Sequence, residues 1–194
     1  DSPVHPVMNR AYAAHSIVVR TAGSADMRDF VRFPWMIYQG DPYWVPPLLQ
    51  RERRRLNPTV NPFYEHASIQ PFLAFRNGQM VGRIAAIVDE SYNGHHGETT
   101  GFFGFFECID DLEVVSELLQ SAADWLLDRG MTLMRGPFNP STSDSLGVLV
   151  DGFDSPPAIL MAYNPSYYPD LLESVGLTKV RDLYAYYMLS LIHI

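Results

Sequence analysis

The chain has 194 residues, of which 47% are hydrophobic and 13% aromatic, and its formal net charge is −8. This composition excludes a disordered chain and predicts one globular domain, while the acidic balance disfavours nucleic acid as a partner. No apolar run reaches the roughly 18 residues of a membrane-spanning helix, and the single cysteine, Cys108, cannot form an internal disulfide, so we expect a cytoplasmic protein without a membrane segment.

The first third of the chain contains one strand, one helix and a proline-rich stretch. Residues 1–15 carry no clear periodic pattern, and we expect a poorly ordered N-terminal segment. The apolar run Ser16–Thr21 predicts a strand. Ser24–Tyr38 predicts a helix that Pro34 kinks or divides. Residues 39–62 are rich in proline and predict irregular backbone with one short helix.

That short helix contains an arginine cluster, defined as Arg51, Arg53, Arg54 and Arg55. The neighbouring leucines would face inward, leaving the guanidinium groups on the outer side. We interpret the cluster as a solvated helical face, and an anion-binding patch is the alternative.

A hairpin and a third strand follow. The segments 71–76 and 80–88 flank Asn77-Gly78, which is a strong turn signal because both positions tolerate positive φ. Residues 90–98 are polar and predict a loop. The aromatic segment Gly101–Cys108 predicts the next strand.

The clearest helix in the sequence spans Asp110–Arg129, where apolar residues recur at three- and four-residue steps. Asp110 is the predicted N-cap, and Gly130 the predicted end. Residues 132–135 then predict a strand. The right-handed crossover of such a strand–helix–strand unit would make its two strands parallel.

A long connection without regular structure, residues 136–166, precedes a predicted helix at 168–175 and a last strand within 178–188. Connections of this length are usually binding segments or packed surface loops, and both interpretations stay open here. Polar groups in the connection stand beside aromatic ones, as a small-molecule pocket requires. We regard residues 189–194 as a doubtful C-terminal tail.

The order of the elements resembles the GNAT-type acyl-CoA N-acyltransferase superfamily, and the chain is most similar to a group of uncharacterised bacterial GNAT-like proteins. The resemblance is carried by DPYWVPPL (41–48), NPFYEHASIQPFLAFRNGQMVGRIAAIVD (61–89), GFFGFFE (101–107), RGPFNPSTSD (135–144), DGFDSPP (151–157) and YNPSYYPDLLESVGL (163–177). It implies an α/β GNAT-like domain over residues 16–188. The implied domain has a mixed twisted sheet, helices on both faces and a V-shaped split between the central parallel strands.

The resemblance implies acyl transfer from acyl-CoA or acetyl-CoA, as cosubstrate, to an unknown small-molecule amine, without a metal. An alternative is a non-catalytic GNAT-like lobe of a tandem protein, which would bind an acceptor or pack against a catalytic second lobe. Proteins of the group run to about twice this length, so the sequence is expected to be a fragment of a longer chain.

Two features depart from the superfamily pattern. The superfamily holds the CoA diphosphate on a glycine-bearing loop before the central helix, whereas residues 107–113 here contain four acids and neither glycine nor base. These acids would repel the negatively charged diphosphate of CoA, so we expect weak binding of acetyl-CoA. The tyrosine that serves as general acid in the superfamily is replaced by Leu172, and Tyr168 lies one turn earlier.

The candidate catalytic residues are therefore Glu107, as a base, and Tyr168, as an acid; helix-entry chemistry is the alternative for Glu107. The candidate substrate-binding residues are Arg135, Phe138, Asn139, Ser141, Asp144 and Tyr163. Metal binding by His95 and His96 is disfavoured, since adjacent histidines rarely converge on one ion. Cys108 is expected to be a buried thiol rather than a nucleophile.

Overall fold

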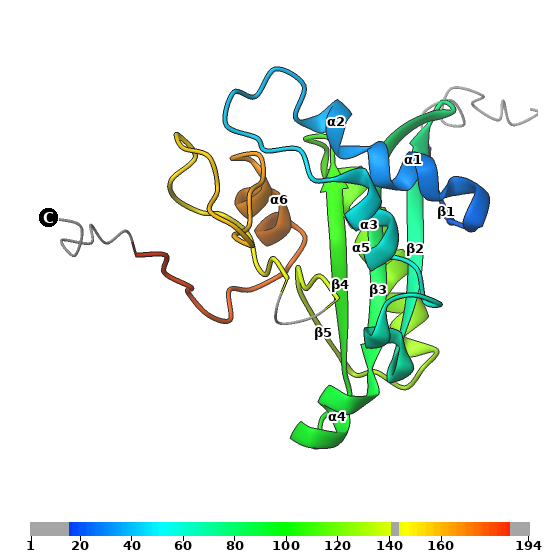
Figure 1. Cartoon of the computed structure of the whole chain (residues 1–194). Coiled ribbons are helices and arrows are strands. Elements are labelled where there is room, and N and C mark those ends of the chain that lie inside the picture. Colours follow the sequence, from blue (N-terminus) through cyan, green and yellow to red (C-terminus); the bar gives the residue numbers. More distant parts are fainter. Residues whose placement is uncertain (1–15, 141–143, 187–194) are drawn as a thin grey trace, which may run out of the picture.

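The computed structural model describes residues 16–140 and 144–186 and contains a five-stranded sheet in the order β1-β2-β3-β4-β5 (Figure 1). The strands are β1 Ile17–Thr21, β2 Ala67–Arg76, β3 Gln79–Asp89, β4 Thr100–Cys108 and β5 Leu133–Arg135. Neighbouring strands are antiparallel except for β4 and β5, which are parallel. The predicted mixed sheet and its parallel pair are confirmed.

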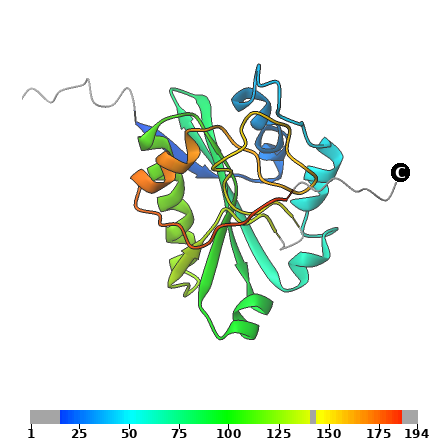
Figure 2. The ribbon, with the colours of Figure 1, turned by 90° about the vertical axis from the view of Figure 1, so that its left-hand side faces the viewer.

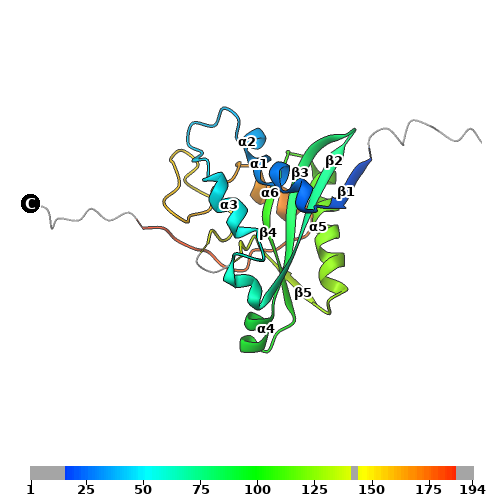
Figure 3. The same ribbon diagram turned by 45° about the vertical axis from the view of Figure 1, so that its right-hand side comes forward.

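Helices cover both faces of the twisted sheet (Figures 2 and 3). On one face lie α1 (Met27–Arg32), α2 (Pro34–Ile37) and α3 (Leu49–Arg55), and on the other lie α5 (Leu112–Leu127) and α6 (Tyr168–Ser174). Pro34 divides the predicted first helix, because its ring cannot follow a helical residue without displacing the preceding turn. A 3-10 turn, η2 (Ser24–Asp26), precedes α1.

The core has two layers because successive side chains of a strand point to opposite faces. Ala74 and Ile84 join the buried cluster under α5, whereas their neighbours Leu73 and Ala85 join the cluster under α1 and α3. The buried apolar side chains of α5 pack in the cluster that contains Ala74 and Ile84, as the periodicity of the helix predicts. None of the helices in the described residues is both long and apolar enough to span a membrane.

The hairpin forms at Asn77-Gly78, where both residues adopt positive φ. Strand β2 begins earlier than predicted, at Ala67, and contains Pro71. The proline is tolerated there because it lies beyond the end of β1, where its carbonyl accepts from the Ala22 N–H and no partner strand requires its missing donor.

Two predicted elements were wrong. Residues 90–98 are not a polar loop: α4 (Glu90–His96) forms there, capped by the Asp89 carboxylate and ended by Gly97 at φ 64°. The polar sequence gave no periodic signal for a helix, and only the cap residues at its two ends indicate one. The last predicted strand is absent from the described residues 178–186, which extend away from the sheet (Figure 1) with no strand beside them to pair with. A short 3-10 helix, η3 (Pro62–Glu65), was also not predicted.

Candidate functional site

The predicted split between the parallel strands is present. Strands β4 and β5 pair over three residues only, from Thr100 to Phe102 on β4. Strand β4 then continues to Cys108, while the chain leaves β5 after Arg135 and enters the long connection. An opening therefore forms beside the second half of β4.

The opening is produced by a bulge in β4 and by one side chain of the connection. Phe105 adopts φ 51° at a register shift between β3 and β4, a conformation that costs a non-glycine residue roughly 1–2 kcal/mol. Its N–H donates to the Asn139 Oδ1 at 2.7 Å. Asn139 thus takes the hydrogen bond that a longer β5 would take. The neighbouring residue of β4, Gly104, must be glycine, because a Cβ at this position would overlap the Phe138 carbonyl.

A cavity of about 220 Å³ lies at this opening. Its polar lining groups come from segments that are distant in the sequence, and they include Tyr38, Glu52, Arg55, Arg83, Glu107, Asn139, Ser145, Tyr163, Asn164 and Tyr168. Apolar and aromatic side chains complete the walls. Polar groups converging in an apolar cavity are what a small-molecule site requires.

Glu107 is the centre of this group. Its Oε2 accepts hydrogen bonds from the Tyr168 hydroxyl at 2.8 Å and the Tyr38 hydroxyl at 3.0 Å. The Arg83 guanidinium lies 3.9 Å from the other carboxylate oxygen, and it also donates to the Phe30 carbonyl at 2.6 Å. The carboxylate is therefore held between one cation and two phenols inside the protein.

Burial raises the pKa of Glu107 above its ordinary value, although Arg83 and the two tyrosine hydroxyls favour the charged form and oppose this effect. Burial, together with the Glu107 charge, also holds the pKa of Tyr38 and Tyr168 well above their ordinary value. Both phenols therefore keep their protons at neutral pH. A carboxylate with a raised pKa beside protonated phenols is a suitable group for proton transfer.

Tyr163 connects the long connection to the proline-rich stretch. Its hydroxyl donates to both oxygens of Asp41, at 2.9 and 2.8 Å, and its carbonyl accepts from the Tyr38 hydroxyl. Burial and the Asp41 carboxylate raise the pKa of Tyr163 to about 12. Trp44 stacks on Tyr38 with ring centroids 4.9 Å apart, so this wall of the cavity is a fixed aromatic cluster.

The structure brings together four of the predicted site residues and separates the others. Glu107, Tyr168, Asn139 and Tyr163 line the cavity, whereas Arg135 and Phe138 do not. Arg135 pairs with Glu98 at 2.9 Å and donates to the Tyr92 hydroxyl, and Phe138 stacks on Phe102. Ser141 lies outside the described residues.

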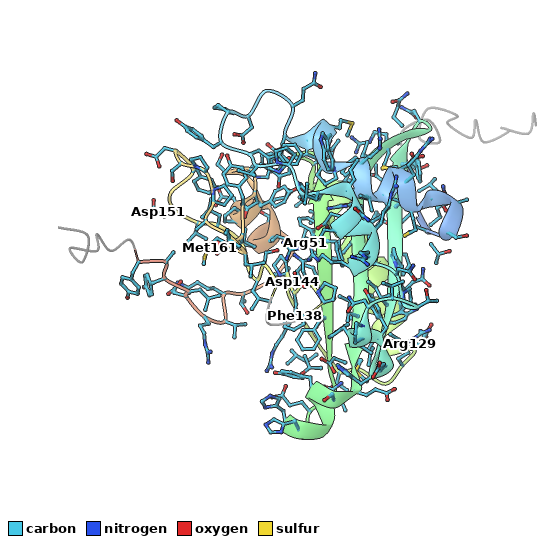
Figure 4. All side chains as sticks on the ribbon, in the orientation of Figure 1. Arg51, Arg129, Phe138, Asp144, Asp151 and Met161 are labelled. Atoms are coloured by element: carbon cyan, nitrogen blue, oxygen red, sulfur yellow. The ribbon has the colours of Figure 1, made fainter. Side chains whose placement is uncertain are left out.

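Asp144 lies outside this cavity, on the wall of a second one. Its Oδ1 is 3.6 Å from the Arg51 guanidinium and 3.5 Å from the Arg55 Nε (Figure 4). Asp144 therefore contacts the arginine cluster rather than the group around Glu107.

Two central residues were not predicted from the sequence. Arg83 stands alone among apolar residues in β3, and the sheet register places it opposite Glu107. A charge in the interior of an apolar strand was the available signal, since a buried charge requires a partner. Tyr38 carried no such signal, because its position depends on the division of the helix at Pro34.

The start of α5 also differs from prediction, since Asp111 and not Asp110 is the N-cap. The Asp111 Oδ1 accepts from the N–H groups of Glu113 and Val114. Arg76 of β2 lies 2.6 Å from Asp111 and 3.0 Å from Glu113. This guanidinium holds the pKa of Asp111 below its ordinary value and balances part of the acidic charge that the sequence places there.

Cys108 is buried, and burial raises the pKa of its thiol, as expected for a thiol that is not a nucleophile. Its backbone N–H donates to the Tyr168 hydroxyl, and its carbonyl accepts from Tyr167. Across residues 16–140 and 144–186, no group of three His, Cys, Asp or Glu side chains is placed to hold a metal ion.

Two known proteins are similar in sequence to most of the chain. A protein named bacterial ceramide synthase from Caulobacter vibrioides is 39% identical over 170 residues, which are 87% of this chain and 44% of that protein. Protein YghO of Escherichia coli is 36% identical over 163 residues, 84% of this chain and 42% of its own length. The chain thus spans less than half of these relatives. No protein-family model matches it.

Solved structures share the fold at low sequence identity. The aminoglycoside N-acetyltransferase AAC(6')-Iy in complex with CoA is 10% identical, with a TM-score of 0.53, over 90% of this chain and 95% of that one. An aminoglycoside acetyltransferase from an uncultured soil sample, in complex with sisomicin, is 11% identical with a TM-score of 0.52, over 90% and 97% of the two chains. At such identities the likeness is one of fold.

Proposed function

We propose, since this chain has the fold of the GNAT-type N-acyltransferases, that it transfers an acyl group from a CoA thioester to an amine. The observation that carries the proposal is the position of Glu107, which faces a cavity at the split of the parallel strands with its pKa raised by burial. A raised pKa makes a carboxylate a stronger base than one in water, which favours proton removal from a substrate.

In the proposed reaction Glu107 removes a proton from the amine as its nitrogen attacks the thioester carbon. The new C–N bond forms as the C–S bond breaks, giving an amide and a thiolate. Arg83 would limit the rise of the Glu107 pKa, since it lies 3.9 Å away and stabilises the carboxylate.

Tyr168 is the proposed acid that gives a proton to the departing thiolate. Its hydroxyl lies 2.8 Å from Glu107 and is held by the Cys108 N–H. The proton that Glu107 gains can then return to the tyrosine, which balances the transfer. Asn139 and Tyr163 are proposed to contact the substrate from the long connection, since both line the cavity. Arg135, Phe138 and Asp144 are not retained as contacts in this cavity.

The class of amine is proposed from the Caulobacter relative. A ceramide synthase forms an amide on a long-chain amino alcohol, so a sphingoid base and a long-chain acyl-CoA are the first substrates to test. The chain covers 44% of that relative, so the activity of the whole relative is carried to this chain only as part of this proposal.

A non-catalytic lobe is the second candidate, favoured by the start of α5. The N–H groups of Glu113 and Val114, which could hold a diphosphate, are already occupied by Asp111. In this candidate the chain binds an acceptor or packs against a second lobe that carries the CoA site. Weak binding of acetyl-CoA by this chain is a prediction of this second candidate.

The deciding experiment incubates the chain with palmitoyl-CoA and sphinganine and measures the amide by mass spectrometry and the released thiol by absorbance. Catalysis by this chain predicts both products, and a loss of at least about a hundredfold in rate for Glu107→Gln and for Tyr168→Phe. Amine binding without either product would favour the non-catalytic lobe.

Glu98→Gln is the matched control. Glu98 is also a glutamate paired with an arginine, but it lies outside the cavity residues. Glu98→Gln removes the same charge as Glu107→Gln but outside the cavity, so this control should retain the rate of the unmodified chain. Equal rate losses in Glu98→Gln and Glu107→Gln would contradict a catalytic role for Glu107.

A further inference from the structure

A second, larger cavity of about 690 Å³ lies against α3 and the stretch that follows it. Its wall combines guanidinium groups with apolar side chains: Leu48, Leu49, Arg51, Arg54, Arg55 and Val60. The acyl-transfer proposal uses none of these residues.

The apolar part of this wall is unusually exposed. Leu48, which was expected to face inward, is 77% exposed, and Val60 is 50% exposed, although removing apolar surface from water is favourable. Both side chains face the same cavity. An apolar ligand lying there would cover surface that the fold itself leaves in water.

The charged part of the wall is positive within an acidic protein. Four arginines stand in the seven residues of α3, where Glu52 and Asp144 are the only carboxylates that contact them among the described residues. Glu52 is engaged by Arg55 at 2.8 Å. Arg54 lines the cavity and has no ion-pair partner in residues 16–140 and 144–186. The wall therefore carries unbalanced positive charge.

Arg55 connects the second cavity to the first, because its side chain lines both. Its guanidinium lies over the Phe105 ring, 5.1 Å from the centroid, at the bulge of β4. Its Nε and one terminal nitrogen are buried without a hydrogen-bond partner among the described residues, although Nε is 3.5 Å from Asp144. Buried donors of this kind favour an acceptor oxygen from a ligand.

From these observations we infer that the second cavity binds an anionic amphiphile, a molecule with one apolar chain and a phosphate or carboxylate head. The head would lie beside Arg54 and Arg55, and the chain against Leu48 and Val60. This inference is independent of the proposed acyl transfer, because binding to the second cavity is measured without turnover. If acyl transfer fails, the binding can still be tested, and the reverse also holds.

The test measures binding of dodecyl phosphate, below its micelle concentration, by titration calorimetry. Arg54→Ala should weaken binding at least about tenfold, because a charge-assisted contact is lost. Arg53→Ala is the matched control: Arg53 is exposed on the same helix but does not line the cavity, so its loss should change affinity less than about twofold. Leu48→Ser should reduce the advantage of dodecyl over butyl phosphate.

Three results would overturn the inference. Equal losses in the Arg53 and Arg54 variants would show general electrostatic attraction. Equal affinity for dodecyltrimethylammonium would remove the role of the guanidinium groups. Binding to phosphatidylglycerol vesicles without binding to monomeric dodecyl phosphate would identify a membrane surface, and not a single amphiphile, as the partner.

Discussion

Glu107 and Asp111 lie four residues apart, at the end of β4 and the start of α5, and their carboxylates are in opposite states. Glu107 faces the cavity between Arg83 and two phenols, and burial raises its pKa. Asp111 caps a helix beside Arg76, whose side chain is 25% exposed, and this contact lowers the pKa of Asp111. One acidic run thus contains a carboxylate that holds a helix and another that is suited to proton transfer. Burial and partners, and not residue type, make the difference.

Removing the partner of the buried carboxylate should have the largest effect. Arg83→Met leaves Glu107 without its cation and removes the hydrogen bond to the Phe30 carbonyl, so we expect a loss of about 3–5 kcal/mol in the free energy of unfolding. Denaturant titration measures it. Adding Glu107→Gln to Arg83→Met should recover part of the loss, since no buried charge then remains unpaired.

Removing the helix cap should have a smaller effect. Asp111→Ala deprives the Glu113 and Val114 N–H groups of their acceptor, and we expect a loss of about 0.5–2 kcal/mol in unfolding free energy. Asp111→Ser should recover most of it. Asp110→Ala, one position earlier, should change thermal stability little, and equal losses at both positions would contradict the assignment of the cap.

The two carboxylates should also give opposite dependences of stability on pH. The raised pKa of Glu107 makes a contribution that is fully present below the unfolded value of 4.5 and is lost as pH rises through the folded pKa. Its slope is at most about 1.4 kcal/mol per pH unit. Glu107→Gln should therefore gain stability relative to the unmodified chain as pH rises above 4.5.

For Asp111, whose pKa is lowered from 3.8, the contribution is present above that value and is lost as pH falls through the folded pKa. Asp111→Asn should thus differ most from the unmodified chain above pH 3.8 and converge with it below. Unfolding titrations at a series of pH values test both signs. The same sign in both variants would show that the two environments are not distinct.

The smallest effect is expected at Arg76. Its partners Asp111 and Glu113 are 24% and 54% exposed, so solvent screens both pairs. We expect Arg76→Met to cost about 1 kcal/mol or less in unfolding free energy, and less at high salt. A loss as large as that of Arg83→Met would remove the contrast between a largely buried and a partly exposed ion pair.

Sequence patterns predicted the elements that have strong local signals. Asn77-Gly78 predicted the hairpin, the apolar stripe predicted α5, and Pro34 predicted the division of the first helix. They failed where local signals were weak or absent. Helix α4 has no apolar periodicity, and the choice between Asp110 and Asp111 as cap depends on one residue of backbone geometry.

Within the site, the resemblance to the superfamily singled out Glu107 and Tyr168, and the composition of the long connection singled out Asn139 and Tyr163. It could not identify Tyr38 and Arg83 as their partners. Tyr38 contacts Glu107 across 69 residues of sequence, and Arg83 meets it only through the register of two strands. Pairing over such separations depends on packing, which no local pattern contains.

The sequence by itself therefore determined the hairpin, helix α5, the parallel strand pair and the long connection beside it, because periodicity, turn residues and crossover handedness act over short distances. Only the tertiary structure decided which acid is buried, which one caps a helix and which arginines remain unbalanced beside a cavity. Those properties depend on burial and on the charges that surround each group, and both arise when distant segments pack together.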